Sequence, residues 1–186
     1  MPDKPTLRAA MKARLAAMTT AERAAASSEI CRELAHALSS ARVVLAFHPM
    51  ASEPDVLPWA AELLCRGVVV GLPRVDWTTG EMRGHVVKDF VELVAARGGL
   101  REPRAEAPML PAPDLVLVPG LAFCAVGLRL GRGGGHYDRF LASLPSTTRT
   151  CGVAFESQVV EQIPRDPWDV AMKALVTERG LRRFGV

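Results

Sequence analysis

The chain has 186 residues, of which 49% are hydrophobic and 23% are charged. This balance is typical of a soluble globular protein and excludes a fibrous or disordered chain. The formal net charge is +3, and the basic residues are scattered along the chain. Aromatic residues are few, with a single Tyr. These features favour a small anionic ligand over nucleic acid, because nucleic-acid binding usually needs a basic stripe and stacking aromatics.

The cysteines lie far apart and form no C-x-x-C pair, which predicts reduced thiols rather than a zinc or redox site. They are Cys31, Cys65, Cys124 and Cys151. The opening "MPDKPTLRAAMKARL" lacks the apolar core of an export signal, and the longest apolar run, residues 115–128, is broken by Pro119 and Gly127. We therefore expect a cytoplasmic protein that does not contact a membrane.

The first third of the chain predicts two helices and then a βαβ unit. Residues 7–18 repeat Leu or Met at helical spacing, and Thr19–Glu22 has the pattern of a capping box that opens a second helix. The β-rich run over residues 42–49 is ended by Pro49. A helix through Trp59 then stops at Gly67, and a second strand follows directly over residues 68–73.

Strands and helices continue to alternate in the rest of the chain. The expected elements are a strand over residues 81–87, a proline-rich loop over 103–113, a buried strand over 114–120, a helix over 137–144, a strand over 150–154, a short helix over 156–162 and a last strand over 173–178. This alternation predicts an α/β fold over residues 1–186: a single-domain three-layer sandwich with a mostly parallel central sheet and helices on both faces. Ligands of such folds bind beyond the carboxyl ends of the strands.

The stretch "RLGRGGGHYDR", residues 129–139, is the clearest functional candidate. It lacks the Lys and Ser or Thr of a P-loop, and His136 stands where a dinucleotide motif needs its third Gly. Glycine N–H groups can still converge on an anion, and Arg129 and Arg132 add positive charge. We favour an anion site over an exposed glycine-rich turn. Asp138 alone is more simply a first-turn carboxylate, with Mg²⁺ ligation as the alternative.

Several segments together resemble 5-formyltetrahydrofolate cyclo-ligases, also called methenyltetrahydrofolate synthetases. They are "DLVLVPGLAF" with "RLGRGGGHYDRFL", "LPRV", "SEPDV", "GLREP" and the ending "IP...WD......VTERG", in the family's order over nearly the whole chain. The resemblance implies a NagB/RpiA/CoA-transferase-like sheet. It also implies conversion of 5-formyltetrahydrofolate to 5,10-methenyltetrahydrofolate with ATP as co-substrate and Mg²⁺ as cofactor. ATP would phosphorylate the formyl oxygen, N10 would close the ring, and ADP and phosphate would be released.

The resemblance also implies roles for individual residues. The ATP contacts are Lys4, Arg8, Arg74, Arg129, Gly131, Arg132, Gly133, Gly134, Gly135, His136, Tyr137 and Asp138. The folate contacts are Met50, Glu53, Tyr137 and Trp168; the Mg²⁺ ligands are Asp138 and Asp169; Arg132 and Tyr137 are the catalytic pair. Without the resemblance, Lys4 and Arg8 suit a solvated helix face, Glu53 a helix N-terminal acid and Tyr137 simple packing.

Three residues depart from the family pattern. Cys124 stands where Asp is common, His136 replaces the first aromatic residue of the more usual GYYD, and Lys173 occupies a place that is often acidic. They motivate an alternative, a non-catalytic folate- or nucleotide-binding member of the family. An ATP-independent isomerase or acyl-transfer enzyme of similar architecture is a further alternative. We expect a monomer whose partners are ATP and 5-formyltetrahydrofolate, with or without a polyglutamate tail.

Overall fold

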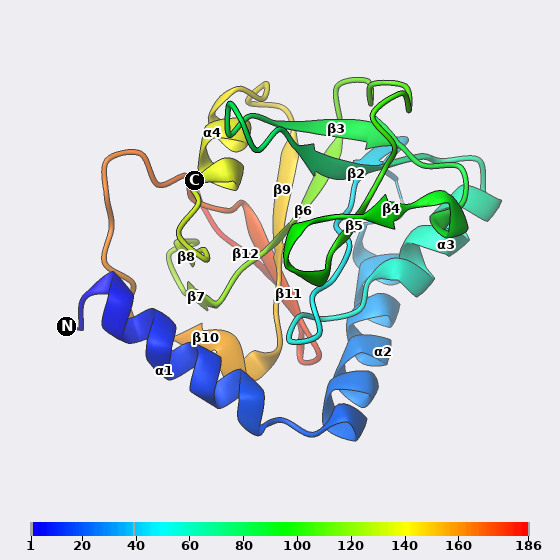
Figure 1. The fold of residues 1–186 in the computed structure, drawn as a ribbon. Coiled ribbons are helices and arrows are strands. Elements are labelled where there is room, and N and C mark those ends of the chain that lie inside the picture. Colours follow the sequence, from blue (N-terminus) through cyan, green and yellow to red (C-terminus); the bar gives the residue numbers. More distant parts are fainter. Residues whose placement is uncertain (1, 39, 186) are drawn as a thin grey trace.

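A computed structural model describes residues 2–38 and 40–185 and is built around a seven-stranded sheet (Figure 1). In sheet order the strands are β12 (Gly180–Arg183), β11 (Ala174–Thr177), β9 (Arg149–Val153), β6 (Leu115–Pro119), β1 (Val43–Leu45), β2 (Val69–Val75) and β3 (Met82–Val86). The inner neighbours pair in parallel, whereas β12 and β3 are antiparallel edge strands. The predicted mostly parallel sheet is therefore confirmed.

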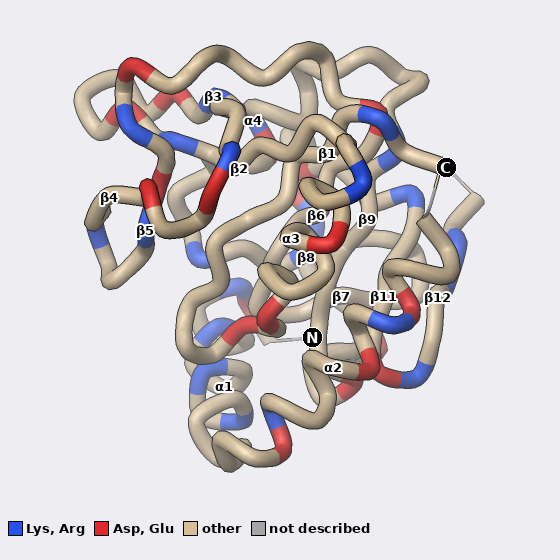
Figure 2. Tube along the Cα trace, turned by 90° about the vertical axis from the view of Figure 1, so that its right-hand side faces the viewer, with Lys and Arg blue, Asp and Glu red and all other residues tan. Residues whose placement is uncertain are grey.

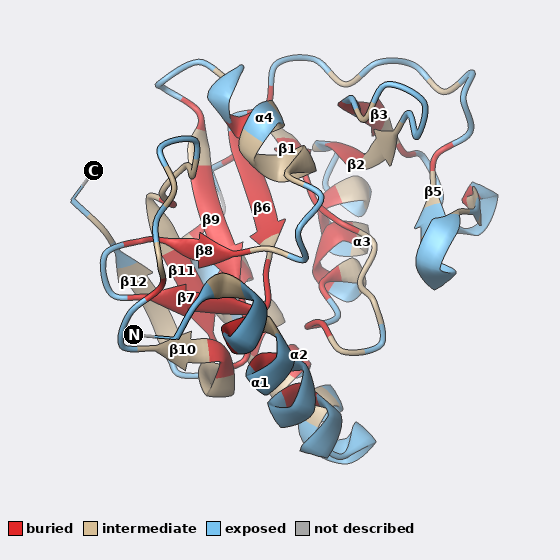
Figure 3. Cartoon of the chain, turned by 60° about the vertical axis from the view of Figure 1, so that its left-hand side comes forward, coloured by how far each residue is buried: buried red, intermediate tan, exposed pale blue. Residues whose placement is uncertain are grey.

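Two apolar clusters lie on opposite faces of this sheet, because successive strand residues point to opposite sides. Leu115 and Leu117 of β6 belong to the cluster that includes residues of α1 (Lys4–Ala17), α2 (Thr20–Ala37) and α3 (Leu57–Cys65). Val116 and Val118 belong to the cluster that includes residues of α4 (His136–Ala142). Figure 3 shows the central strands as the most deeply buried part of the chain. Helices thus cover both faces, as predicted.

The helix boundaries follow the local sequence signals closely. The Oγ1 of Thr19 accepts a hydrogen bond from the Glu22 backbone N–H at 3.2 Å, and the Glu22 carboxylate accepts one from the Thr19 backbone N–H at 2.7 Å. This is the predicted capping box at the start of α2. At α4 the helix begins one residue earlier than predicted, at His136, and ends at Ala142.

Short elements escaped the sequence analysis. A three-stranded sheet joins β10 (Val159–Val160), β7 (Ala122–Cys124) and β8 (Arg129–Leu130), and a two-stranded sheet joins β4 (Val94–Ala95) and β5 (Arg101–Glu102). The 3-10 turns are η1 (Phe90–Glu92), η2 (Arg97–Gly99) and η3 (Glu156–Gln158). The predicted helix over residues 156–162 is wrong: only η3 is helical, and the two valines after it pair with β7. β-Branched residues favour strands.

Charged residues are spread over the molecule rather than gathered into a basic stripe. Figure 2 shows Lys and Arg interspersed with Asp and Glu along the Cα trace. Among residues 2–38 and 40–185, no helix combines the length and apolar character that crossing a membrane would require.

Candidate active site

A cavity of about 610 Å³ lies beyond the carboxyl ends of β1, β2 and β6. Phe47 and His48, which follow β1, line it together with Val75 at the end of β2 and Gly120 directly after β6. Open α/β sheets bind their ligands at this end of the strands. The cavity falls within the size range of small-molecule sites.

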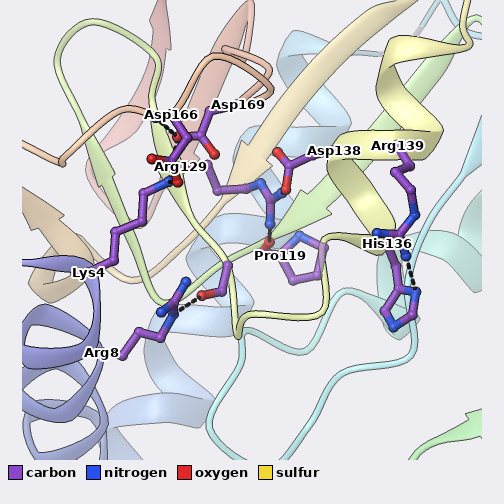
Figure 4. Close-up of polar contacts among 10 residues, drawn as sticks. Lys4, Arg8, Pro119, Arg129, His136, Asp138, Arg139, Asp166 and Asp169 are labelled. Carbon is purple, nitrogen blue, oxygen red and sulfur yellow. Dashed lines mark hydrogen bonds and ion pairs between the residues drawn. The ribbon is translucent and has the colours of Figure 1, made fainter. Parts of the chain in front are cut away.

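Residues 131–135, the glycine-rich middle of the stretch 129–139, connect β8 to α4. They form one wall of the cavity, called the glycine wall below. Gly133 and Gly135 have φ angles of +111° and +64°, a region that side-chain-bearing residues rarely adopt. Arg8 of α1 holds the stretch in place, because its Nε donates a hydrogen bond to the Gly131 carbonyl at 3.0 Å (Figure 4). The glycines therefore give a fixed backbone wall rather than a slack turn.

Lys4 lies beside this wall and pairs with two carboxylates. Its Nζ lies 2.6 Å from Asp169 Oδ2 and 2.7 Å from Asp166 Oδ2 (Figure 4). Burial opposes the lysine charge, but the hydrogen bonds that Lys4 donates to both carboxylates outweigh it, so the pKa of Lys4 is raised above its ordinary value. Lys4 is therefore a firmly charged group on the cavity wall.

The two carboxylates that Lys4 contacts belong to one tight turn, Asp166–Asp169. The Asp166 backbone N–H donates to Asp169 Oδ2 at 2.7 Å, and the Asp169 backbone N–H donates to the Asp166 carbonyl at 3.1 Å. Trp168 in this turn is 70% exposed and lines the cavity. Lys4 thus ties the start of α1 to the turn that carries Asp169 and Trp168.

Two arginines of the glycine stretch also pair with carboxylates. Arg129 Nη2 lies 3.0 Å from Asp138 Oδ2, and the Arg129 side chain is only 4% exposed. Arg132 donates from Nε and Nη2 to Glu53 Oε1 at 3.1 and 3.0 Å, while the other oxygen of Glu53 accepts from the Met50 backbone N–H at 2.9 Å. Residues expected at the phosphates and at the pterin are therefore in direct contact in this structure.

Tyr137 presents a polar group without a partner. Its ring centroid lies 5.5 Å from Arg129 Cζ, and its hydroxyl is buried without a hydrogen-bond partner among the described residues. Burial raises the pKa of the Tyr137 hydroxyl far above its ordinary value, and the nearby Glu53 carboxylate adds to this effect. The hydroxyl stays protonated at neutral pH and can donate a hydrogen bond to a ligand.

His136, which replaces an aromatic residue of the family pattern, contacts the turn between β2 and β3. Its Nδ1 lies 2.9 Å from the Gly80 carbonyl, and its ring meets that of Trp77 edge to face at 5.5 Å. Arg139 Nη2 donates to the same carbonyl at 3.0 Å. His136 therefore anchors the start of α4 while lining the cavity.

Nearly all of the site residues expected from the sequence line this one cavity. They are Lys4, Arg8, Met50, Glu53, Arg129, Gly131, Arg132, Gly133, Gly134, Gly135, His136, Tyr137, Asp138, Trp168 and Asp169. Arg74 is the exception: it pairs with Glu102 and donates to the Pro103 carbonyl at 2.9 Å. It therefore supports the wall that carries Glu102 rather than lining the cavity itself.

Two of the departures from the family pattern lie away from the cavity. Cys124 is buried in β7 and is not among the lining residues. Lys173 Nζ donates to the carbonyls of Ser146 and Thr148, which precede β9. Lys173 therefore lies at the amino ends of the parallel strands, opposite the end that carries the cavity. Neither of these substitutions touches the candidate site.

Several lining residues were missed by the sequence analysis. They are Phe47, His48, Trp77, Arg97, Arg101 and Asp166. Arg101 belongs to the segment "GLREP", which could have pointed to it, whereas His48 and Trp77 stand in no motif. Burial and the charge of Arg101 lower the pKa of His48, which keeps its imidazole neutral.

Asp138 and Asp169 line the same cavity and suit a magnesium ion bound together with phosphates. Mg²⁺ typically takes one or two protein carboxylates and completes its octahedron with phosphate oxygens and water. Among the residues that the structure describes, no three His, Cys, Asp or Glu side chains form a ready metal cluster. Asp138 and Asp169 are therefore two lining carboxylates that could hold such an ion only together with other ligands, such as phosphate oxygens.

The 5-formyltetrahydrofolate cyclo-ligase family matches the chain over residues 1–178. The chain is 37% identical to the 5-formyltetrahydrofolate cyclo-ligase of Mycolicibacterium smegmatis over 159 residues, with 76% of this chain and 77% of that protein covered. The mouse cyclo-ligase is 28% identical over 186 residues, with 92% of each chain covered. The NMR structure of Aquifex aeolicus 5,10-methenyltetrahydrofolate synthetase superposes with a TM-score of 0.85 at 30% identity, covering 98% of this chain and 93% of that one. The chain therefore belongs to the 5-formyltetrahydrofolate cyclo-ligase family.

Proposed function

We propose that the protein converts 5-formyltetrahydrofolate and ATP to 5,10-methenyltetrahydrofolate, ADP and phosphate. The observation that carries this proposal is the shared cavity, in which the glycine wall with Lys4 and Arg8 adjoins Glu53 and Tyr137. One reaction chamber of about 610 Å³ can bring a phosphate donor against a second substrate. The family membership of the chain supports the same reaction.

The chemistry needs activation of the formyl oxygen, because a formamide is a weak electrophile. Transfer of the γ-phosphoryl group to that oxygen breaks its bond to ADP and leaves an iminium carbon that N10 attacks. N10 loses its proton as the ring closes, and the bond between carbon and the phosphorylated oxygen breaks to release inorganic phosphate. The residues mainly position the reactants and neutralise charge, with Arg8, Arg132 and the backbone N–H groups of the glycine stretch at the phosphates.

At the folate end, Glu53 and Tyr137 have complementary roles. A carboxylate accepts the N–H donors of the pterin amino-pyrimidine edge. The Met50 backbone N–H holds Glu53 in place from its other oxygen, Oε2. The protonated Tyr137 hydroxyl would donate to the folate, and Trp168 at the rim would cover it.

Asp138 and Asp169 would hold Mg²⁺, which supplies positive charge to the phosphate oxygens during transfer. Arg129 and Lys4 pair with these two carboxylates at 3.0 and 2.6 Å. The same two contacts hold the carboxylates in position at the cavity wall.

Incubation of the purified protein with 5-formyltetrahydrofolate and Mg-ATP tests this function. We expect methenyltetrahydrofolate absorbance to rise with an equal amount of ADP, and no product when ATP is left out. Binding of both ligands in calorimetry without ADP release would instead establish the non-catalytic alternative. Cys124 and Lys173, two of the departures that motivated that alternative, lie outside the cavity. A monomeric state and a cytoplasmic location remain predictions; light scattering of the pure protein tests the first.

A further inference from the structure

The cations that line the cavity differ in whether a carboxylate already neutralises them. Lys4, Arg129 and Arg132 each have an ion-pair partner. Of the lining residues that the structure describes, Arg8, Arg97 and Arg101 are cations without such a partner. Unneutralised positive charge on a cavity wall favours an anionic ligand group.

These unneutralised cations fall into two separate places. Arg8 contacts the glycine wall through the Gly131 carbonyl. Arg97 and Arg101 belong to η2 and β5, and Figure 3 shows β5 away from α1 and β8. The only acid in β5, Glu102, already pairs with Arg74. The cavity therefore has a second group of unneutralised cations at η2 and β5, apart from the one at the glycine wall.

The second group lies on a short hairpin. β4 and β5 pair as Val94↔Glu102 and Ala95↔Arg101, and the Ala96 backbone N–H donates to the Leu100 carbonyl at 2.9 Å. Arg101 Nη2 is tied to the Leu93 carbonyl at 2.5 Å, which leaves its other N–H groups for a ligand.

Trp77 holds the second arginine of this group. Arg97 Cζ lies 5.1 Å from the centroid of the Trp77 ring, a cation–π distance that places the guanidinium over the ring face. No carboxylate of the described residues pairs with Arg97, so its N–H donors are available to a ligand carboxylate, which guanidinium groups bind in a bidentate geometry.

The hairpin also adjoins the loop that holds Glu53. A Cβ at Gly98 would lie 4.0 Å from Met50 Cε, and the Met50 backbone N–H donates to Glu53. A ligand whose pterin binds at Glu53 therefore lies in the same cavity as Arg97 and Arg101. 5-Formyltetrahydrofolate has its glutamate carboxylates at the end opposite the pterin.

We propose that Arg97 and Arg101 bind the glutamate carboxylates of 5-formyltetrahydrofolate, with Trp77 as the positioning residue for Arg97. This assignment rests on the proposed function. It also explains how one cavity binds two anionic substrates at separate places. The phosphates bind at the glycine wall, and the carboxylates bind at the hairpin.

The test compares two ligands that differ only in the glutamate. The double variant Arg97→Gln/Arg101→Gln is titrated in calorimetry with 5-formyltetrahydrofolate, with 5-formyltetrahydropteroate, which lacks the glutamate, and with Mg-ATP. Because these contacts are charged but solvent-exposed, we expect the Kd for 5-formyltetrahydrofolate to rise about 5- to 20-fold. The Kd values for the pteroate and for Mg-ATP should stay within about twofold of wild type, since neither ligand carries the glutamate.

Arg104→Gln is the matched control, because Arg104 is exposed on the same segment but does not line the cavity. Arg97→Lys/Arg101→Lys should recover part of the affinity, and thermal melts show whether each variant is folded. An equal loss for both folate ligands, no loss, or a loss of Mg-ATP affinity instead would overturn the assignment. If wild-type protein fails to bind 5-formyltetrahydrofolate at all, the proposed function fails, and the assignment with it.

Discussion

Tyr137 combines two properties that packing alone does not explain. Its hydroxyl is buried without a hydrogen-bond partner among the described residues, and it lies in the cavity wall beside Arg129 and the charge of Glu53. Leaving a buried hydroxyl unpaired costs about 1–3 kcal/mol. Such a cost is typical of groups that are held ready for a ligand.

Tyr137→Phe should separate what the hydroxyl contributes to the stability of the protein from what it contributes to catalysis. We expect the free energy of unfolding to stay the same or to rise by about 1 kcal/mol, because the unpaired hydroxyl is removed. The kcat/KM for 5-formyltetrahydrofolate should fall at least about tenfold, since a positioned hydrogen-bond donor is lost. Urea denaturation and steady-state kinetics measure the two effects. A destabilised variant with normal kinetics would mean that Tyr137 serves packing alone.

Asp166 and Asp169 form a natural matched pair, because both contact Lys4 Nζ at nearly equal distances of 2.7 and 2.6 Å. Their side chains differ in exposure, at 42% and 11%, and only Asp169 is expected to bind Mg²⁺. The Mg²⁺ concentration for half-maximal activity should rise about tenfold or more in Asp169→Asn. In Asp166→Asn it should change by less than about threefold, because Lys4 keeps one carboxylate.

Titration of both variants with MgCl₂ at saturating ATP tests this difference. Equal shifts for the two variants would show that Asp169 acts only through Lys4, and the magnesium role would then have to move to other residues.

At the scale of elements, Glu156 ties η3 to the edge of the main sheet. Its carboxylate accepts hydrogen bonds from Arg182 Nη2 at 2.7 and 2.8 Å and from Thr177 Oγ1 at 2.8 Å. Burial opposes the charge of Glu156, but the bonds from Arg182 and Thr177 outweigh it, so the pKa of Glu156 lies below its ordinary value of 4.5.

A lowered carboxyl pKa adds stability that is complete above the ordinary pKa and is lost as the pH falls through the folded-state value. Wild type should therefore exceed Glu156→Gln by about 1 kcal/mol in free energy of unfolding at pH 7. The difference should shrink progressively as the pH falls below about 4.5 and the carboxyl group becomes protonated. Urea melts of both proteins over this range measure it. A difference that does not shrink with falling pH would assign the effect to packing instead.

The elements also show what the sequence could and could not predict. The α2 capping box and the buried β6 strand depend on neighbouring residues, so local patterns found them. β10 exists because Val159 pairs with Phe123, and His136 is placed by Gly80 and Trp77. Such partners are distant in sequence, and no local pattern encodes them. The lining roles of Arg97 and Asp166 went unpredicted for the same reason.

At the scale of the whole molecule, one ion pair links the two halves of the candidate site. The Arg132–Glu53 pair joins the glycine wall to the loop after β1, and Glu53 is only 6% exposed. In the proposed function, phosphates attract Arg132 while the pterin needs the oxygens of Glu53. Binding of ATP phosphates to Arg132 would therefore free Glu53 for the pterin, and binding of the pterin to Glu53 would free Arg132 for the phosphates.

We expect ATP and folate to strengthen each other's binding as a result. A non-hydrolysable ATP analogue with Mg²⁺ should lower the Kd for 5-formyltetrahydrofolate about 5- to 20-fold in calorimetry, and by reciprocity folate should lower the Kd for the analogue by the same factor. In Arg132→Ala this coupling should disappear. Affinity for the analogue should fall more than affinity for folate, because the freed Glu53 remains available to the pterin. Arg139→Ala, which removes an exposed arginine of α4 bound to Gly80, is the control and should keep the coupling. Coupling that survives in Arg132→Ala would show that the ion pair does not transmit it, and equal loss of both affinities would argue against a phosphate role for Arg132.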